Sequence, residues 1–179
     1  MLTYMTEGTI LRIFFTETSH IRFRCMTSKS GVGGFFMNSD SINLLKECNS
    51  GCKNATDSME QVLSFVKDEK LKKIIEDYDD KHIKIGDECH KILNKEGESE
   101  EDPNKITMAM AWFGTEVKLM INDGSDKIAE LMVDGCNMGI KSLSKYNNKY
   151  RNAESKIKDL VFELISVEQD FMNELLAFL

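Results

Sequence analysis

From residue 39 onward, apolar side chains recur every three or four positions, the spacing that places them on one face of an α-helix. The first stripe follows the polar cluster Ser-Asp-Ser at 39–41, which predicts a helix N-cap there and a helix to about Lys67. Asp68 is the predicted N-cap of a second helix that ends near Asn94. So short a connection predicts an antiparallel hairpin. The stripes consist of Leu45, Cys48, Cys52, Ala55, Met59, Val62 and Val66, then Leu71, Ile74, Ile75, Tyr78, His82, Ile85, Cys89 and Ile92.

An acidic loop from Lys95 to Asp102 separates this hairpin from the next predicted helix. Pro103 is well placed at the first helical position, because its missing N–H would have no partner there, and Asp102 can cap it. The helix is expected to span about Pro103 to Asn122, with Gly124 closing it in a left-handed conformation.

Two more helices are predicted in the last third of the chain. Ser125 opens the first, which runs to about Asn148, and Asn152 caps the second. Their apolar stripes are Ile128, Met132, Cys136, Gly139, Leu143 and Tyr146, then Ile157, Val161, Leu164, Ile165, Glu168, Phe171, Met172 and Leu175.

The last two helices repeat the first two. Cys48, Asn49, Gly51 and Lys53 correspond to Cys136, Asn137, Gly139 and Lys141, and further along Leu71, Asp79 and His82 correspond to Leu160, Glu168 and Phe171. A duplicated hairpin predicts a pseudo-symmetric four-helix bundle, with the helix at 103–122 crossing between its halves. Gly135 and Gly139 lie on the helix at about 125–148. We further expect these glycines to let this helix pack tightly against the first helix, which carries Gly51.

Residues 1–36 lack the helical period and hold four basic but only two acidic residues. Adjacent glycines just before Met37 fit a translated ribosome-binding site, because glycine codons begin with two guanines. We therefore expect Met37 to be the natural start, residues 1–36 to be a non-native or disordered N-terminal extension, and residues 37–179 to form the bundle. A short tail or a strand that docks elsewhere is the alternative.

Composition narrows the possible functions. The net charge of −7 argues against a nucleic-acid partner, which would require a basic surface to displace counterions. No apolar run approaches the roughly 20 residues that span a bilayer. Five cysteines, an odd number that falls mostly within helical patterns, fit reduced thiols in a cytoplasmic protein.

The arrangement resembles the ferritin-like superfamily, and more closely an uncharacterised bacterial branch of it. In that branch a tryptophan-bearing crossing helix, like Ala111-Trp112-Phe113, precedes a glycine-rich helix, like 132–139. The resemblance covers about residues 40–179. It implies an all-α, ferritin-like antiparallel four-helix bundle made of two repeated helical hairpins with an extra crossing helix.

Metal-binding members of that superfamily place a carboxylate on each of two helices and a Glu-x-x-His motif on each of the other two. Here Asp79 and His82 match one motif with Asp for Glu, whereas Glu168 is followed by Phe171 in place of the second histidine. The remaining two helices offer cysteines and glycines, which do not supply hard oxygen ligands. We therefore read the di-iron site as lost and expect no cofactor.

Two groups of polar side chains can each be interpreted in more than one way. Asp79, His82 and Glu168 are either a residual site for iron, manganese or zinc, or a polar group satisfied within the core. Cys48 and Cys52 are core residues, part of a soft zinc-type site with Cys136 and His82, or an exposed thiol sensor.

The function predicted from these features is non-enzymatic. We expect a helical bundle that acts as an interaction or sequestration module, with a protein partner or a second copy of itself left open. The alternative is a degenerate metal-binding protein that uses Asp79, His82 and Glu168.

Overall fold

The computed structural model describes residues 3–6, 9–12, 37–100 and 124–179. Contacts divide the chain into two units, Met1–Phe35 and Phe36–Leu179. In the first unit, strand β1 (Thr3–Thr6) pairs antiparallel with β2 (Thr9–Arg12). The predicted crossing helix at 103–122 lies outside the described residues, and the prediction that Met37 is the natural start stays a prediction.

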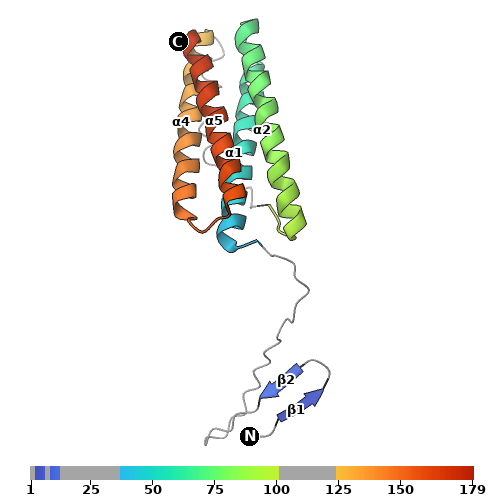
Figure 1. Ribbon diagram of the computed structural model, residues 1–179. Coiled ribbons are helices and arrows are strands. Elements are labelled where there is room, and N and C mark those ends of the chain that lie inside the picture. Colours follow the sequence, from blue (N-terminus) through green and yellow to red (C-terminus); the bar gives the residue numbers. More distant parts are fainter. Residues whose placement is uncertain (1–2, 7–8, 13–36, 101–123) are drawn as a thin grey trace, which may run out of the picture. The chain divides into compact units, whose positions relative to one another are not determined.

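In the second unit, the described helices form an antiparallel four-helix bundle (Figure 1), which confirms the predicted all-α fold. They are α1 (Ser39–Leu63), α2 (Glu69–Glu96), α4 (Ser125–Lys149) and α5 (Ser155–Leu175), followed by the 3-10 turn η2 (Leu176–Phe178). Helix α1 packs against α2 and α4, and α5 packs against the same two helices. None of the described helices is apolar enough over sufficient length to cross a bilayer.

Contacts at one end of the bundle establish the helix directions. The backbone N–H of Met37 donates to the Glu96 carboxylate at 3.0 Å, so α2 ends beside the start of α1. The Ser41 hydroxyl accepts from the Glu154 N–H at 2.8 Å, so α1 and α5 begin side by side. Helices α1 and α5 therefore run parallel, and α2 and α4 run the other way. Helix α2 therefore ends and α4 begins at opposite ends of the bundle (Figure 1), an order found in bundles with one long crossover.

The ends of the first hairpin partly match the sequence prediction. Asp68 caps α2 as expected, accepting from the N–H groups of Lys70 and Leu71 at 2.8 and 3.0 Å. Helix α1 instead begins with Asn38 as its N-cap and stops at Leu63. The predicted cap at 39–41 and the predicted end near residue 67 are therefore wrong.

Polar side chains at the start of α1 form hydrogen bonds with the turn between α4 and α5. The Asp40 carboxylate accepts from the Asn152 N–H, and the Asn38 side chain donates to the Asn152 carbonyl, both at 3.0 Å. Asn152 is consequently not the cap of α5, whose N-cap residue is Glu154. Gly124 has φ −80° and precedes α4, so the predicted left-handed conformation there is also wrong.

The core consists of two apolar clusters separated by a polar layer. We call the cluster at the α1 start the proximal cluster, which includes Leu44, Leu45, Cys48, Cys52, Ile85, Cys89, Leu93, Leu143, Ile157, Val161 and Leu164. The distal cluster includes Met59, Val62, Leu71, Ile75, Tyr78, Ile128, Met132, Cys136, Phe171 and Leu175. Both clusters are built largely from the predicted stripes. His82 lies between the two clusters on α2, and Glu168 lies between them on α5.

Candidate functional site

Helices α2 and α5 each bring one ionisable side chain into the middle of the bundle. His82 is 0% exposed and Glu168 is 6% exposed, and His82 Nε2 lies 3.4 Å from Glu168 Oε1. The other ring nitrogen, Nδ1, lies 2.7 Å from the Tyr78 carbonyl oxygen, so Nδ1 carries a hydrogen and donates it. The Nε2–Oε1 distance is that of an ion pair, and Nε2 makes no hydrogen bond with any of the described residues.

The surroundings of His82 favour its charged form. Burial lowers the pKa of His82, but the Glu168 carboxylate, the Tyr78 carbonyl and the charge of Asp79 outweigh it and hold this pKa above 6.5. The contact therefore favours the imidazolium form of His82 facing the Glu168 carboxylate. Removing one partner would leave the other charged and buried, which is strongly destabilising.

Asp79 does not complete a three-residue site. Its pKa is raised, first by burial and then by the charge of Glu60, and its Oδ1 makes no hydrogen bond. Within the described ranges, no group of three or more His, Cys, Asp or Glu side chains is arranged to hold a metal ion. The structure thus pairs His82 with Glu168, whereas Asp79 acts on His82 through its charge alone.

An aromatic stack stands where the repeat would place a second histidine. Phe171 stacks on Tyr78 with ring centroids 4.6 Å apart and planes inclined by 16°. The Tyr78 hydroxyl donates to the Glu174 carboxylate at 2.8 Å. Since a dinuclear iron centre needs carboxylates and a second imidazole here, the residues present do not fit one.

Two glycines on α4 shape the space beside the pair. A Cβ atom at Gly139 would lie 2.7 Å from Glu168 Oε1, so the carboxylate occupies the volume that a side chain would need. Among the described residues, a Cβ atom at Gly135 would meet nothing within 4 Å. The prediction that both glycines pack tightly against the first helix is therefore wrong, because one faces a side chain of α5 and the other faces open space.

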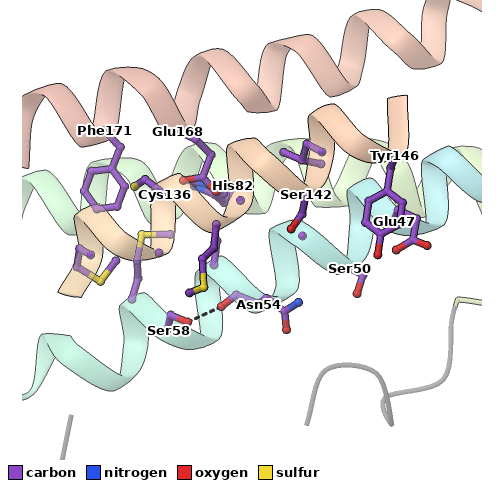
Figure 2. Close-up of a pocket in the computed structure, with 18 residues that line it drawn as sticks. Glu47, Ser50, Asn54, Ser58, His82, Cys136, Ser142, Tyr146, Glu168 and Phe171 are labelled. Carbon is purple, nitrogen blue, oxygen red and sulfur yellow. Dashed lines mark hydrogen bonds and ion pairs between the residues drawn. The ribbon is translucent and has the colours of Figure 1, made fainter. Parts of the chain in front are cut away.

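That open space is part of a cavity of about 350 Å³ between α1 and α4. Figure 2 shows His82 and Glu168 beside each other among the residues that line it, with Cys136 and Phe171 nearby. Helix α1 lines it with Glu47, Ser50, Gly51, Asn54, Ala55, Ser58 and Met59. Helix α4 lines it with Met132, Gly135, Cys136, Met138, Gly139, Ser142, Leu143 and Tyr146.

Sequence reasoning missed the polar wall of this cavity. Ser50, Asn54 and Ser58 recur every four residues on α1, next to its apolar stripe. The Ser58 hydroxyl donates to the Asn54 carbonyl at 2.7 Å (Figure 2), whereas the Asn54 side-chain oxygen is buried without a hydrogen-bond partner. A small polar stripe opposite a glycine-rich helix was the available signal.

The cysteines contribute to the core. Cys48 and Cys52 are 0% and 2% exposed, and the thiols of Cys52 and Cys89, followed by burial, raise the pKa of Cys48. A thiol sensor would need an accessible, acidic thiol, so this environment opposes that interpretation. Cys136 belongs to the distal cluster and Cys48 to the proximal one, so these thiols do not converge on one zinc-type site.

One solved structure shares this architecture. A crystal structure of a DUF305 fragment from Deinococcus radiodurans aligns with a TM-score of 0.63 and 11% sequence identity, covering 79% of this chain and 95% of that chain. At this identity the likeness establishes the helical fold alone. No protein-family model and no curated protein matches the chain.

Proposed function

We propose that this protein is a non-enzymatic bundle that sequesters a small molecule in the cavity between α1 and α4. The observation that supports this is an opening of about 350 Å³ that reaches from the surface side chains of α1 and α4 to the buried His82–Glu168 pair. Its volume falls in the range of roughly 300–1,000 Å³ typical of ligand pockets. Methionine side chains on its walls adapt readily to apolar ligands.

The chemistry at the cavity floor favours binding over catalysis. His82 Nε2 faces the Glu168 carboxylate, and this contact favours the protonated imidazole, which cannot act as a general base. Burial, followed by the neighbouring Glu168 carboxylate, raises the pKa of the Cys136 thiol, so it stays protonated and weakly nucleophilic. We therefore assign no catalytic role to either residue.

The relation to the ferritin-like superfamily is also a proposal. It is supported by two hairpins joined by one long connection, and by His82 and Glu168 at the positions where the repeat places metal ligands. In this proposal the protein is a bacterial, cytoplasmic relative in which Phe171, stacked on Tyr78, stands in place of the second histidine.

The proposed function is tested by filling the cavity. Gly135→Leu projects a side chain into open space, whereas Gly135→Ala adds only a methyl group and is the matched control. We expect cyclohexylmethanol or its amine analogue to shift the backbone NMR signals around the cavity in the wild type and in Gly135→Ala. In Gly135→Leu these shifts should disappear while circular dichroism shows a folded helical protein.

Binding that is unchanged in Gly135→Leu, or the absence of binding to wild type by every probe at millimolar concentration, would overturn the proposal. The metal alternative is separated by elemental analysis of untagged protein. We expect no stoichiometric iron, manganese or zinc. Metal that is present in the wild type and lost in His82→Ala would instead support the site of Asp79, His82 and Glu168.

A further inference from the structure

The Glu168 carboxylate and the Asn54 side-chain oxygen line the cavity as hydrogen-bond acceptors that the described residues do not saturate. A carboxylate accepts at about four lone-pair positions, and the polar neighbours of Glu168 at the floor are His82 and the weakly donating thiol of Cys136. The Asn54 side-chain oxygen on the α1 wall is buried and unpaired. The His82 ring is 0% exposed, and its Nε2 faces Glu168 Oε1 at 3.4 Å. Buried acceptors such as the Glu168 carboxylate and the Asn54 side-chain oxygen are costly unless a donor reaches them.

The charges around the cavity select the kind of donor. Glu168 at the floor and Glu47 on the α1 wall are acidic, and among the described residues that line the cavity His82 is the one basic side chain. The aromatic rings of Phe171 and Tyr146 also line the cavity, and such rings attract cations. The remaining walls include Met59, Met132 and Leu143, which suit an apolar body.

We infer that the cavity binds a small apolar amine, whose ammonium group pairs with the Glu168 carboxylate at the floor. This inference rests on the proposed function and names its ligand class. The ammonium group supplies donors to Glu168, and the hydrocarbon body lies against the methionine and leucine side chains. A carboxylic acid of the same shape is excluded by repulsion from Glu168 and Glu47.

The test compares three ligands that share one apolar body. Cyclohexylmethylamine, cyclohexylmethanol and cyclohexanecarboxylate are titrated into the full-length protein at pH 7 by calorimetry, where the amine is protonated. We expect the amine to bind about tenfold more tightly than the alcohol, because a charge-assisted hydrogen bond in a partly desolvated site is stronger than a neutral one. The carboxylate should bind most weakly.

Glu168→Gln keeps the shape of the side chain and removes its charge. In this variant the amine should lose its advantage and bind within about threefold of the alcohol, which should itself bind as it does to the wild type. If the variant fails to fold, the ranking of the three ligands on the wild type decides the inference alone. Gly135→Leu should abolish binding of all three.

The outcomes separate the inference from the proposed function. Equal affinity of wild type for amine and alcohol, with both lost in Gly135→Leu, would overturn the inference and leave the sequestering function standing. An amine preference that persists in folded Glu168→Gln would also overturn it. Failure of all three ligands to bind would show that the cavity is closed or filled in solution, and would overturn the proposed function itself.

Discussion

A single buried ion pair interrupts an otherwise apolar core at the residue scale. His82 and Glu168 face each other between two hydrophobic clusters, and the residues one turn away, Tyr78 and Phe171, belong to the distal cluster. Replacing one partner leaves an unpaired buried charge, which costs roughly 3–5 kcal/mol in comparable pairs. The pair is therefore a condition for folding as well as the floor of the cavity.

The charge of His82 predicts how stability depends on pH. The pKa of His82 in the folded protein is raised above its ordinary value of 6.5, so the imidazolium form is stabilised by folding. This contribution is fully present below pH 6.5 and is lost as the pH rises through the folded-state pKa. Urea unfolding at pH 6 to 9 should show a declining free energy of unfolding, and the decline should be smaller in His82→Gln. A pH dependence in His82→Gln equal to that of the wild type would contradict this assignment.

Two glycines one turn apart should respond oppositely to the same substitution. Gly135→Ala adds a methyl group in open space and removes a helix-disfavouring glycine, so we expect a stabilisation of up to about 1 kcal/mol. Gly139→Ala places a Cβ atom 2.7 Å from Glu168 Oε1, so we expect it to displace the carboxylate and destabilise the protein. The His82 pKa, followed by NMR, should fall only in Gly139→Ala. Equal effects of the two substitutions would show that Glu168 is not held against α4.

At the scale of helices, the sequence predicts the elements and their buried faces but not what caps them. Periodicity identifies four helices because burial of one face determines which residues are apolar. Caps depend on tertiary neighbours, and here Ser41 and Asp40 serve the α4–α5 turn although the chain presents them as a cap for α1. The sequence did not predict the cavity either. A glycine such as Gly135 marks either a close contact or an opening, and the spacing of residues does not distinguish the two.

The hydrogen bond between Ser41 of α1 and the N-terminus of α5 can be tested by substitution. Ser41 is 0% exposed and its hydroxyl accepts from the Glu154 N–H, so Ser41→Ala should leave that N–H without its partner. We expect a loss of about 1 kcal/mol in the free energy of unfolding, together with faster amide exchange at Glu154. Ser39→Ala, at an exposed position nearby, is the control and should change stability by less than about 0.5 kcal/mol. Similar losses in both variants would rule out the cross-hairpin cap.

For the whole molecule, the packing makes each hairpin dependent on the other. Both core clusters draw side chains from all four described helices, and α1 contacts α4 as well as its own hairpin partner α2. A hairpin alone would expose most of the surface that the bundle buries, and two-helix fragments rarely bury enough to fold. The duplication visible in the sequence is therefore not a division into two independent units.

Fragment complementation tests this dependence. Residues 37–100 and 124–179, expressed separately, should each show weak helicity by circular dichroism, because neither contains a complete cluster. Mixing them should restore helicity and a cooperative thermal transition. Cooperative unfolding of either fragment by itself would contradict the prediction.

The methionine at the mouth of the cavity makes this protein sensitive to its handling. Met138 lines the cavity and is 46% exposed, so oxidants in solution reach its sulfur while Met59 and Met132 stay covered. Oxidation to the sulfoxide would turn an apolar wall polar at the entrance, without disturbing the helices beneath. Preparations stored in air should lose affinity for apolar compounds before they lose their fold, and a methionine sulfoxide reductase should restore it.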